Sequence, residues 1–371
     1  MAELLRAPFP PKSKLAHGPQ LALRISNSRI QSSRPLTSPK RNSSVNFVAD
    51  SGSDYTYWMP VASKSSLPRR KAGKPLSRPA VPPKISAPWS LRSSGNLRIL
   101  ELEAFKKLPW LLHGFSTAPG GVSDLDGQKA LNLGFTDWDT RENVIENRKR
   151  FQTALGAQKF PLINLKQIHS AVVWPFASVP KEPCNGDASL TNTPGLLLGV
   201  QTADCVPILL VDPKKRAVAA VHAGWRGTLA RILEKAVGEL VAKFKSQPSD
   251  LLAAIGPAIG PCCYEVGAEL VIQFTSQFAD ATDYFDEPRS GEEPNPLQWL
   301  NMMPPGHQPP PKSVHLDLGK ANRSQLLAAG LRENNIFSSG LCTACHPSLF
   351  FSYRKQGARS GRLLSAVAIR S

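Results

Sequence analysis

Two short runs of apolar residues near the middle of the chain predict a pair of buried strands. They cover Cys205 to Val211 and Ala217 to Val221, and a polar corner that begins with Asp212-Pro213 separates them. Apolar runs of this length, bounded by turn residues, are typical of strands that are buried on both faces. Cys205 begins the first run and His222 follows the second. The pattern therefore places a metal-binding side chain at one end of each strand.

The segment that follows His222, Ala-Gly-Trp-Arg-Gly-Thr, predicts a tight turn into a helix. Gly224 and Gly227 give the backbone the freedom to turn, and we expect the helix to run from about Thr228 to Phe244. A thiolate, an imidazole, the guanidinium of Arg226 and a helix N-terminus would then lie close together. Such groups suit a metal ion and an anion held side by side.

The remaining apolar patterns predict alternating strands and helices. We expect a helix capped by Asp139 or Thr140 and ending near Leu155, and further helices at 265–278 and 320–331. Strands are expected at 108–115, 161–175 (one strand or a pair, containing His169), 195–201, 251–255, 349–353 and 363–369. This alternation predicts an α/β fold: a single domain, residues 97–371, with a mixed, largely buried β-sheet flanked by helices.

Residues 1–96 differ in composition from the rest and predict a disordered basic leader. They contain 16 Lys and Arg and only three acidic residues, and they lack hydrophobic periodicity. Such a segment buries too little apolar surface to offset its ordering entropy. A Ser- and Arg-rich, acid-poor leader is typical of an organelle transit peptide. Its Ser and Pro content favours a plastid (chloroplast), with a mitochondrial leader or a cytoplasmic tail as alternatives.

The basic charge of the chain belongs mainly to this leader. The net charge is +17, yet residues 97–371 hold 29 basic and 25 acidic residues. No basic stripe interleaved with aromatic residues is present there, so we expect no nucleic-acid partner. No apolar run reaches the roughly 18 residues that span a bilayer, so no membrane partner is expected.

The six cysteines indicate reduced thiols with metal or catalytic roles, because they are too sparse for a disulfide-stapled scaffold. Cys342-Thr-Ala-Cys345-His346 fits the pattern of c-type haem attachment, but no haem-sized helical pocket is indicated. A zinc knuckle needs a second Cys/His pair at short spacing, and the sequence offers none. We interpret these cysteines as structural thiols, and the adjacent Cys262 and Cys263 as small buried thiols. Residues 280–312 form an acidic, Pro-rich stretch that predicts a surface insertion.

Several separated blocks together resemble the YfiH-like family, long described as laccase-domain or multicopper polyphenol oxidase proteins. These blocks are HGFSTAPGGVS at 113–123, LNLGF at 131–135, LKQIHS at 165–170, GDASLTNTPG at 186–195, QTADCVPILL at 201–210, AVHAGWRGT at 220–228, IGPAIGPCCYEVG at 255–267 and FFSYRKQGARSGR at 350–362. The resemblance covers about residues 97 to 371. It implies a YfiH-like fold and a zinc-dependent purine nucleoside phosphorylase that also deaminates adenosine.

The resemblance also implies the metal ligands, which are His169, Cys205 and His222. On its own, a histidine beside an apolar run is more often a core or edge residue, so the role of His169 comes from the resemblance. Two imidazoles and one thiolate leave a fourth tetrahedral position for substrate, as a catalytic zinc requires. The implied partners are purine nucleosides (inosine, adenosine, guanosine, methylthioadenosine) and phosphate; the oligomeric state stays open.

The expected substrate-binding residues are Asp204, Gly224, Arg226 and Arg354. Asp204 is a candidate acid or base for deamination, although it can instead be structural. The chain departs from the family where Ala118 replaces an arginine that often follows the threonine of the first block. If that arginine holds an anion in the family, Arg226 or Arg354 is the candidate to replace it here.

Three other functions remain open from the residues. A multicopper oxidase needs about ten histidines for its coppers, whereas this chain has seven, so copper is disfavoured. A Cys–His thiol hydrolase would use Cys205 as nucleophile and His222 as base. A metal-stabilised binding module would bind a purine without turnover.

Overall fold

The computed structural model describes Ile85, residues 87–286 and residues 314–371, all within one unit, Lys74–Ser371. Most of the predicted leader and most of the predicted insertion lie outside the described residues. The fold begins earlier than predicted, because β1 (Trp89–Ser94) pairs antiparallel with β2 (Leu97–Leu102). The leader prediction is therefore wrong for 89–94. This strand is mostly polar, and Trp89 is its one buried residue, so its apolar pattern is too weak to detect.

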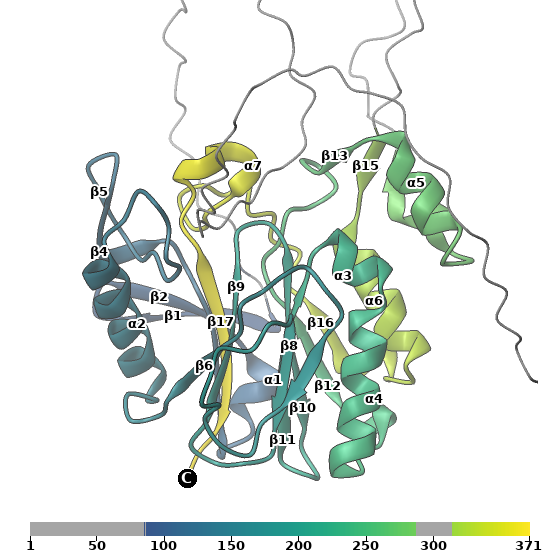
Figure 1. Ribbon diagram of the computed structural model, residues 1–371, viewed down its shortest axis with the longest axis horizontal. Coiled ribbons are helices and arrows are strands. Elements are labelled where there is room, and N and C mark those ends of the chain that lie inside the picture. Colours follow the sequence, from purple (N-terminus) through teal and green to yellow (C-terminus); the bar gives the residue numbers. More distant parts are fainter. Residues whose placement is uncertain (1–84, 86, 287–313) are drawn as a thin grey trace, which may run out of the picture. The chain divides into compact units, whose positions relative to one another are not determined.

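Twelve of the strands form two six-stranded sheets (Figure 1). The first sheet has the order β1, β2, β3 (Leu111–Ser116), β17 (Leu363–Ile369), β9 (Leu197–Thr202) and β6 (Leu162–Asn164). The second has the order β16 (Ile336–Ser338), β12 (Leu252–Ile255), β10 (Val206–Asp212), β11 (Ala217–Ala223), β8 (Ala188–Thr191) and β7 (Val173–Pro175). The predicted α/β class is confirmed. The strands are divided between two sheets, where one was expected.

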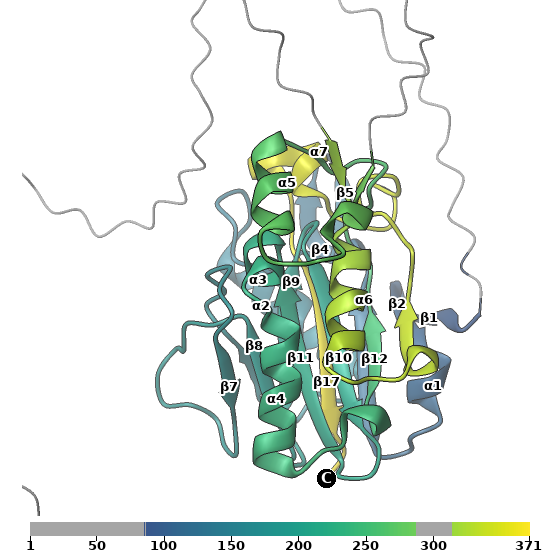
Figure 2. The same cartoon turned by 90° about the vertical axis from the view of Figure 1, so that its right-hand side faces the viewer.

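The two sheets pack face to face around a shared core. Leu198 and Val367 of the first sheet belong to the same buried cluster as Leu209 and Val218 of the second. Helices α4 (Ile232–Phe244) and α6 (Leu318–Ala328) cover the other face of the second sheet, and α2 (Arg141–Leu155) covers the other face of the first (Figures 1 and 2). Both faces of the central strands are thus buried. This burial explains why their sequences are continuous apolar runs and show no alternation.

The hairpin of β10 and β11 directs His222 into the space between the sheets. Its register pairs Val206 with Ala223 and Pro207 with His222. Because side chains alternate along a strand, His222 shares a face with Val218 and Ala220, which belong to the core between the sheets. The predicted buried strand pair is confirmed, and it sets the direction of one candidate ligand.

Three predicted helices begin or end differently in the structure, and the one expected at 320–331 is α6, which covers Leu318–Ala328. Helix α2 follows the prediction, since the Thr140 side chain caps it by accepting from Asn143 N at 3.2 Å. The helix expected at 228–244 is instead split into α3 (Trp225–Leu229) and α4, because Arg231 adopts a left-handed φ of 60° between them. The helix expected at 265–278 begins later, at α5 (Ala268–Thr275).

A small sheet accounts for the late start of α5. Its strands are β13 (Glu265–Val266), β15 (Val314–Leu316) and β14 (Phe285–Asp286).

The strand predicted at 349–353 is wrong: Phe350 and Phe351 are buried in the core between the sheets, but they lie in a loop before α7 (Tyr353–Gln356). An apolar run indicates that its residues are buried, and here the buried residues belong to a loop. The other elements are α1 (Glu103–Lys106), β4 (Pro119–Leu125), β5 (Gln128–Ala130) and 3-10 turns at Pro248–Asp250, Ala281–Tyr284, Glu333–Asn335 and Gly357–Arg359.

Among the described helices, none combines the length with the apolar character that a bilayer crossing requires.

Candidate metal centre

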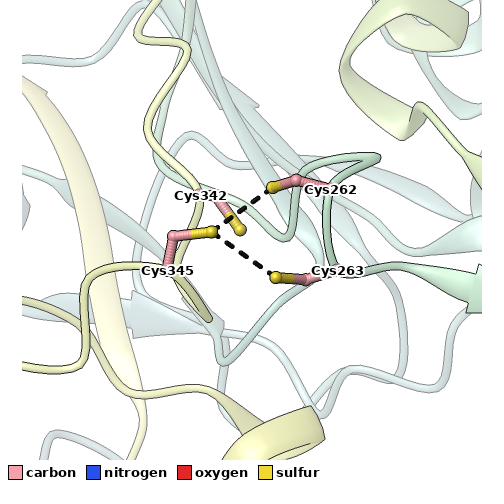
Figure 3. A group of neighbouring side chains, drawn as sticks. All are labelled: Cys262, Cys263, Cys342 and Cys345. Carbon is pink, nitrogen blue, oxygen red and sulfur yellow. Dashed lines mark hydrogen bonds between the residues drawn. The ribbon is translucent and has the colours of Figure 1, made fainter. Parts of the chain in front are cut away.

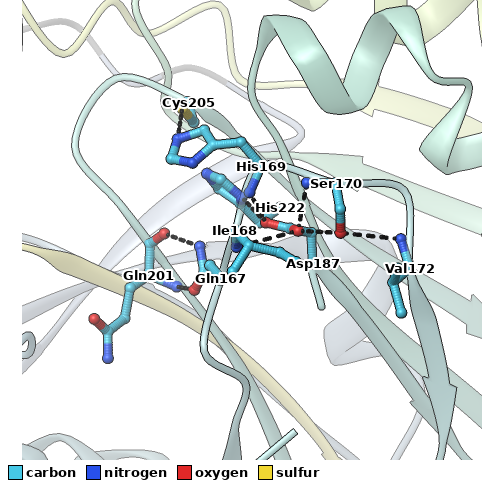
Figure 4. A network of polar contacts seen from close by, with 9 residues as sticks. All are labelled: Gln167, Ile168, His169, Ser170, Val172, Asp187, Gln201, Cys205 and His222. Atoms are coloured by element: carbon cyan, nitrogen blue, oxygen red, sulfur yellow. Dashed lines mark hydrogen bonds and ion pairs between the residues drawn. The ribbon is translucent and has the colours of Figure 1, made fainter. Parts of the chain in front are cut away.

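Three segments far apart in the sequence bring His169, Cys205 and His222 together (Figure 4). Cys205 immediately precedes β10, and His222 lies near the end of β11. His169 lies on the connection from β6 in the first sheet to β7 in the second. One ligand atom from each residue lies within 4.8 Å of the others. The Cys205 Sγ is 3.9 Å from the His169 Nε2, and the two imidazole rings are 5.0 Å apart at 80°.

These separations fit a single tetrahedral ion. Zn–S and Zn–N bonds of about 2.3 and 2.05 Å place a ligating sulfur and nitrogen about 3.5 Å apart. The 3.9 Å between Cys205 and His169 needs only a small closure to reach that value. Two nitrogen donors and one sulfur donor suit zinc. The three residues therefore fit the expected ion, and their role as its ligands stays a prediction.

Asp187, immediately before β8, organises this group from beneath (Figure 4). Its buried carboxylate accepts a hydrogen bond from His222 Nδ1 at 2.9 Å. It also accepts from the backbone N–H groups of Ile168 (3.3 Å), His169 (3.0 Å) and Ser170 (2.6 Å), and from the Ser170 hydroxyl at 2.6 Å. One carboxylate thus fixes the loop that carries His169 and leaves the Nε2 of His222 for a metal. Carboxylate–histidine pairs of this kind orient metal-binding imidazoles in many proteins.

The backbone of the His169 loop is held in an unusual conformation. His169 has a φ of 56°, a left-handed value that costs a non-glycine residue about 1 to 3 kcal/mol. The Gln167 side chain ties this loop to β9, because its Nε2 donates to Gln201 O and its Oε1 accepts from Gln201 N, both at 2.7 Å. Strain that neighbouring contacts impose in this way is typical of functional loops.

The electrostatics of the centre favour a thiolate. Burial alone would raise the pKa of Cys205, but the neighbouring His222 and His169 outweigh it and lower that pKa to about 6. Burial would lower the pKa of His222, but the Cys205 thiolate and Asp187 raise it to about 9. Burial of Asp187 would raise its pKa, yet hydrogen bonds from His222 and Ser170 hold the pKa below its ordinary value.

These pKa values predict how metal affinity depends on pH. Between about pH 6 and 9 the metal-free centre holds a Cys205 thiolate and a protonated His222, so metal binding releases one proton. Affinity should therefore rise about tenfold per pH unit in this range. Below pH 6 the thiolate also gains a proton, so affinity should fall at least about a hundredfold per unit. A zinc competition titration against a chelator of known pH dependence measures both slopes. A pH-independent affinity from 6 to 8 would contradict the assignment.

Gly224 supplies the close wall of the centre. A Cβ at this position would lie 3.0 Å from both the Cys205 Sγ and the His169 Cδ2. A side chain here would force the two candidate ligands to shift by a few tenths of an ångström. Gly224 is predicted from the sequence to bind substrate. In the structure it borders the candidate metal centre, where the absence of a side chain leaves room for the two ligands.

Asp204 is held by other parts of the chain. Its Oδ1 accepts from the Thr343 hydroxyl and its Oδ2 from Arg354 N, both at 2.6 Å. Its carbonyl accepts from Ile259 N at 2.8 Å, and its φ is 101°. Both carboxylate oxygens thus already have partners. This arrangement supports the structural interpretation of Asp204, which positions the adjacent Cys205.

The two candidate arginines differ in their contacts. The Arg354 guanidinium donates to Glu265 O at 2.9 Å and lies over the Tyr264 ring. Arg226 is exposed, and its Cζ lies 4.3 Å from the centroid of the Trp225 ring. The predicted phosphate site at the helix N-terminus lacks its long helix, since Arg226 belongs to the five-residue α3. Ala118 is buried in the core between the sheets.

Sequence reasoning missed Asp187 and the gathering of four cysteines. It included Asp187 only within the GDASLTNTPG block, although an aspartate directly before a buried strand was a usable signal. It also interpreted Cys262 and Cys263 as buried thiols and sought a second Cys pair at short spacing. In the structure, Cys262 and Cys345 are exposed, and the two pairs meet.

Comparison with known proteins shows the family. Residues 112–370 match the family model described as multi-copper polyphenol oxidoreductase laccase. Purine nucleoside phosphorylase LACC1 of Mus musculus is 30% identical over 266 residues, which cover 70% of this chain and 56% of the mouse protein. The chain therefore spans little more than half the length of that relative.

Bacterial relatives match over most of their length. Purine nucleoside phosphorylase YlmD of Geobacillus stearothermophilus is 35% identical over 272 residues, 69% of this chain and 89% of that protein. Adenosine deaminase RL5, from an unknown prokaryotic organism, is 32% identical over 281 residues, 72% of this chain and 99% of that protein. The crystal structure of YlmD matches with a TM-score of 0.62 and 31% identity, over 76% of this chain and 99% of that one. The chain thus belongs to the predicted YfiH-like family, whose model carries the laccase description.

Proposed function

We propose that the protein is a zinc-dependent purine nucleoside phosphorylase with a secondary adenosine deaminase activity. The observation that carries this proposal is the convergence of His169, Cys205 and His222 on one point, with Asp187 behind them. Three protein ligands leave a fourth position for substrate or water. Two relatives that are more than 30% identical, a purine nucleoside phosphorylase and an adenosine deaminase, support the same chemistry.

The proposed substrates are inosine, adenosine, guanosine and methylthioadenosine, each cleaved by phosphate to a base and a ribose 1-phosphate. When bound, a zinc ion supplies Lewis acidity at this point. The chain supplies the rest: Asp187 holds His222 in one tautomer, and the Cys205 thiolate places a negative charge beside it. The transition state gains positive charge on the sugar, so a bound phosphate dianion stabilises it as well as attacking it.

A nucleoside panel assayed with and without phosphate tests the proposal. We expect inosine to yield hypoxanthine and ribose 1-phosphate only when phosphate is present, and adenosine to yield some inosine without it. Release of hypoxanthine that does not depend on phosphate would make the protein a hydrolase. Tight purine binding with no product would leave a binding module, and oxidation of phenols with bound copper would restore the laccase function.

Arg226 is the better candidate for the phosphate. Its exposed guanidinium lies over the ring of its neighbour Trp225, whereas the Arg354 guanidinium already donates to Glu265 O. Arg226 also lies two residues from Gly224, which borders the metal centre.

Replacing Arg226 with methionine should therefore weaken phosphate binding selectively. A lost charge-assisted hydrogen bond of about 1.5 to 3 kcal/mol corresponds to about a 10- to 100-fold rise in the KM for phosphate. Steady-state kinetics at saturating nucleoside measure it. The matched control is Arg359→Met, since Arg359 is an exposed arginine paired with Asp126 at 2.6 Å. If Arg354→Met raises this KM and Arg226→Met does not, Arg354 holds the phosphate.

One observation also favours a thiol hydrolase. Cys205, His222 and Asp187 form a series in which a low-pKa thiol adjoins a histidine that a carboxylate orients, as in enzymes with a cysteine nucleophile.

Alkylation separates the two functions. If Cys205 is a metal ligand, saturating zinc should slow its reaction with iodoacetamide by about 100-fold or more, because a ligated thiolate is no longer free to attack. Mass spectrometry after cleavage at aspartate measures the rate for the Cys205 peptide, and Cys184, which this cleavage places on a different peptide, serves as the internal control. Equal alkylation rates of Cys205 with and without zinc would favour the thiol hydrolase.

A further inference from the structure

Four further cysteines meet at a second point and form a group that shares no residue with the three candidate ligands (Figure 3). Cys262 and Cys263 lie on the loop that follows β12, and Cys342 and Cys345 lie on the loop that follows β16. One sulfur from each lies within 4.8 Å of the other three. The Cys345 sulfur is 3.4 Å from that of Cys262 and 3.5 Å from that of Cys263.

We propose that Cys262, Cys263, Cys342 and Cys345 bind a structural zinc ion. Four thiolates around one tetrahedral zinc, with Zn–S bonds of about 2.3 Å, lie about 3.8 Å from one another. In the structure the Cys345 sulfur lies slightly closer than this to two of the others, and all four sulfurs lie within 4.8 Å of one another. Four sulfur donors fill every tetrahedral position, which is the mark of a structural zinc site. A cluster of several irons is larger than one ion and would hold the sulfurs further apart.

The loop around the first pair is shaped to hold a thiolate. The backbone N–H of Gly260 donates to the Cys342 Sγ at 3.2 Å, and such N–H···S bonds stabilise the charge of metal-bound sulfur. A Cβ on Gly260 would lie 3.3 Å from the Cys342 Cβ and 3.4 Å from the Cys262 Sγ. Glycine thus lets the loop close around the sulfurs. Cys262 and Cys345 are exposed, so an ion can reach the site from solvent.

The same two loops hold the backbone beside the first centre. Ile259 N, on the first loop, donates to Asp204 O, and the Thr343 hydroxyl, on the second, donates to Asp204 Oδ1. The loops are also joined by Thr343 N donating to Ala258 O at 2.9 Å. Asp204 directly precedes Cys205. A metal ion that ties the loops together would therefore position Cys205 through Asp204, although it lies outside the reacting atoms.

Zinc content of the purified full-length protein tests the proposal. We expect two zinc ions per chain in the wild type and one in the double variant Cys262→Ser/Cys345→Ser. Cys184→Ser, which changes a cysteine outside both groups, should keep two. X-ray absorption at the zinc edge should show four sulfur neighbours for the ion that remains in Cys205→Ala, where only the first centre has lost a ligand.

The wild-type measurements decide the question even if the double variant does not fold. One zinc per chain with few sulfur neighbours would overturn the proposal, as would disulfides among these four cysteines in zinc-replete protein. Iron in place of zinc would overturn the identity of the ion. The result is independent of catalysis: a protein without phosphorolysis that still holds a four-sulfur zinc supports this site and rejects only the proposed function.

Discussion

Replacing Asp187 with asparagine should lower the zinc affinity of the first centre about 10- to 100-fold. Asparagine keeps the shape of aspartate but has only one acceptor oxygen, and its NH₂ group would face donors. In the wild type both oxygens accept, one from His169 N and His222 and the other from Ile168 N and Ser170. The variant therefore leaves buried donors without a partner. It should also lose about 3 to 5 kcal/mol of unfolding free energy, the usual cost of breaking a buried charged pair.

Two measurements separate these effects. Urea unfolding of the metal-free protein gives the loss of stability, and a chelator competition on the folded protein gives the loss of affinity. Ser170→Ala is the matched control because it removes one hydroxyl donor from the same carboxylate. It should cost about 1 kcal/mol and change zinc affinity only a few-fold. A folded Asp187→Asn variant with wild-type zinc affinity would show that Asp187 does not orient His222 for a metal.

Much of the central fold could be predicted because burial determines its sequence. The apolar runs of β10, β11 and β17 lie with both faces covered, and such runs can be detected without knowing their partners. The capped helix α2 could be predicted from Thr140 and its apolar face. The division into two sheets could not be predicted, because an apolar run does not show which strands will pair with it.

The errors arose where tertiary contacts outweigh local pattern. Arg231 breaks a helix that its sequence favours, with its guanidinium bonded to Glu234 at 2.6 Å and lying over the Phe278 ring. Phe350 and Phe351 fill the core from a loop. The pair Cys262 and Cys263 lies about eighty residues before the pair that contains Cys345. The two pairs meet because they follow β12 and β16, which are parallel neighbours. Spacing rules for metal sites assume short loops and cannot detect such a pairing.

Some residues of the candidate centre could be predicted from the sequence, and others could not. Cys205 and His222 could be found from the strand pattern, because register places them at adjacent strand ends. His169 required the family resemblance, since its loop has no pattern of its own. Its position depends on Asp187, which lies 18 residues away and supplies acceptors for three consecutive backbone N–H groups. Such a contact is tertiary, and no local period encodes it.

Replacing Cys205 with alanine should reduce kcat/KM for phosphorolysis by about a thousandfold or more, equivalent to about 4 kcal/mol of transition-state stabilisation. The centre then keeps two imidazoles but loses its only anionic ligand, and its zinc should fall by one ion per chain. Cys184→Ala is the control, because Cys184 belongs to neither cysteine group and its sulfur donates to Glu182 O at 3.6 Å.

The variant His169→Ala shows whether the activity lost in Cys205→Ala reflects the loss of a metal ligand or of a nucleophile. A metal centre needs His169 as much as Cys205, so both variants should lose zinc and activity to a similar degree. A thiol nucleophile activated by His222 would need His169 far less, and that variant would keep most of its turnover. Phosphorolysis rates and zinc content of the two variants, measured side by side at pH 7.5, distinguish these outcomes. Retained activity in both would remove the three-residue centre as the seat of the reaction, because each variant lacks one of the three protein ligands that would hold the ion.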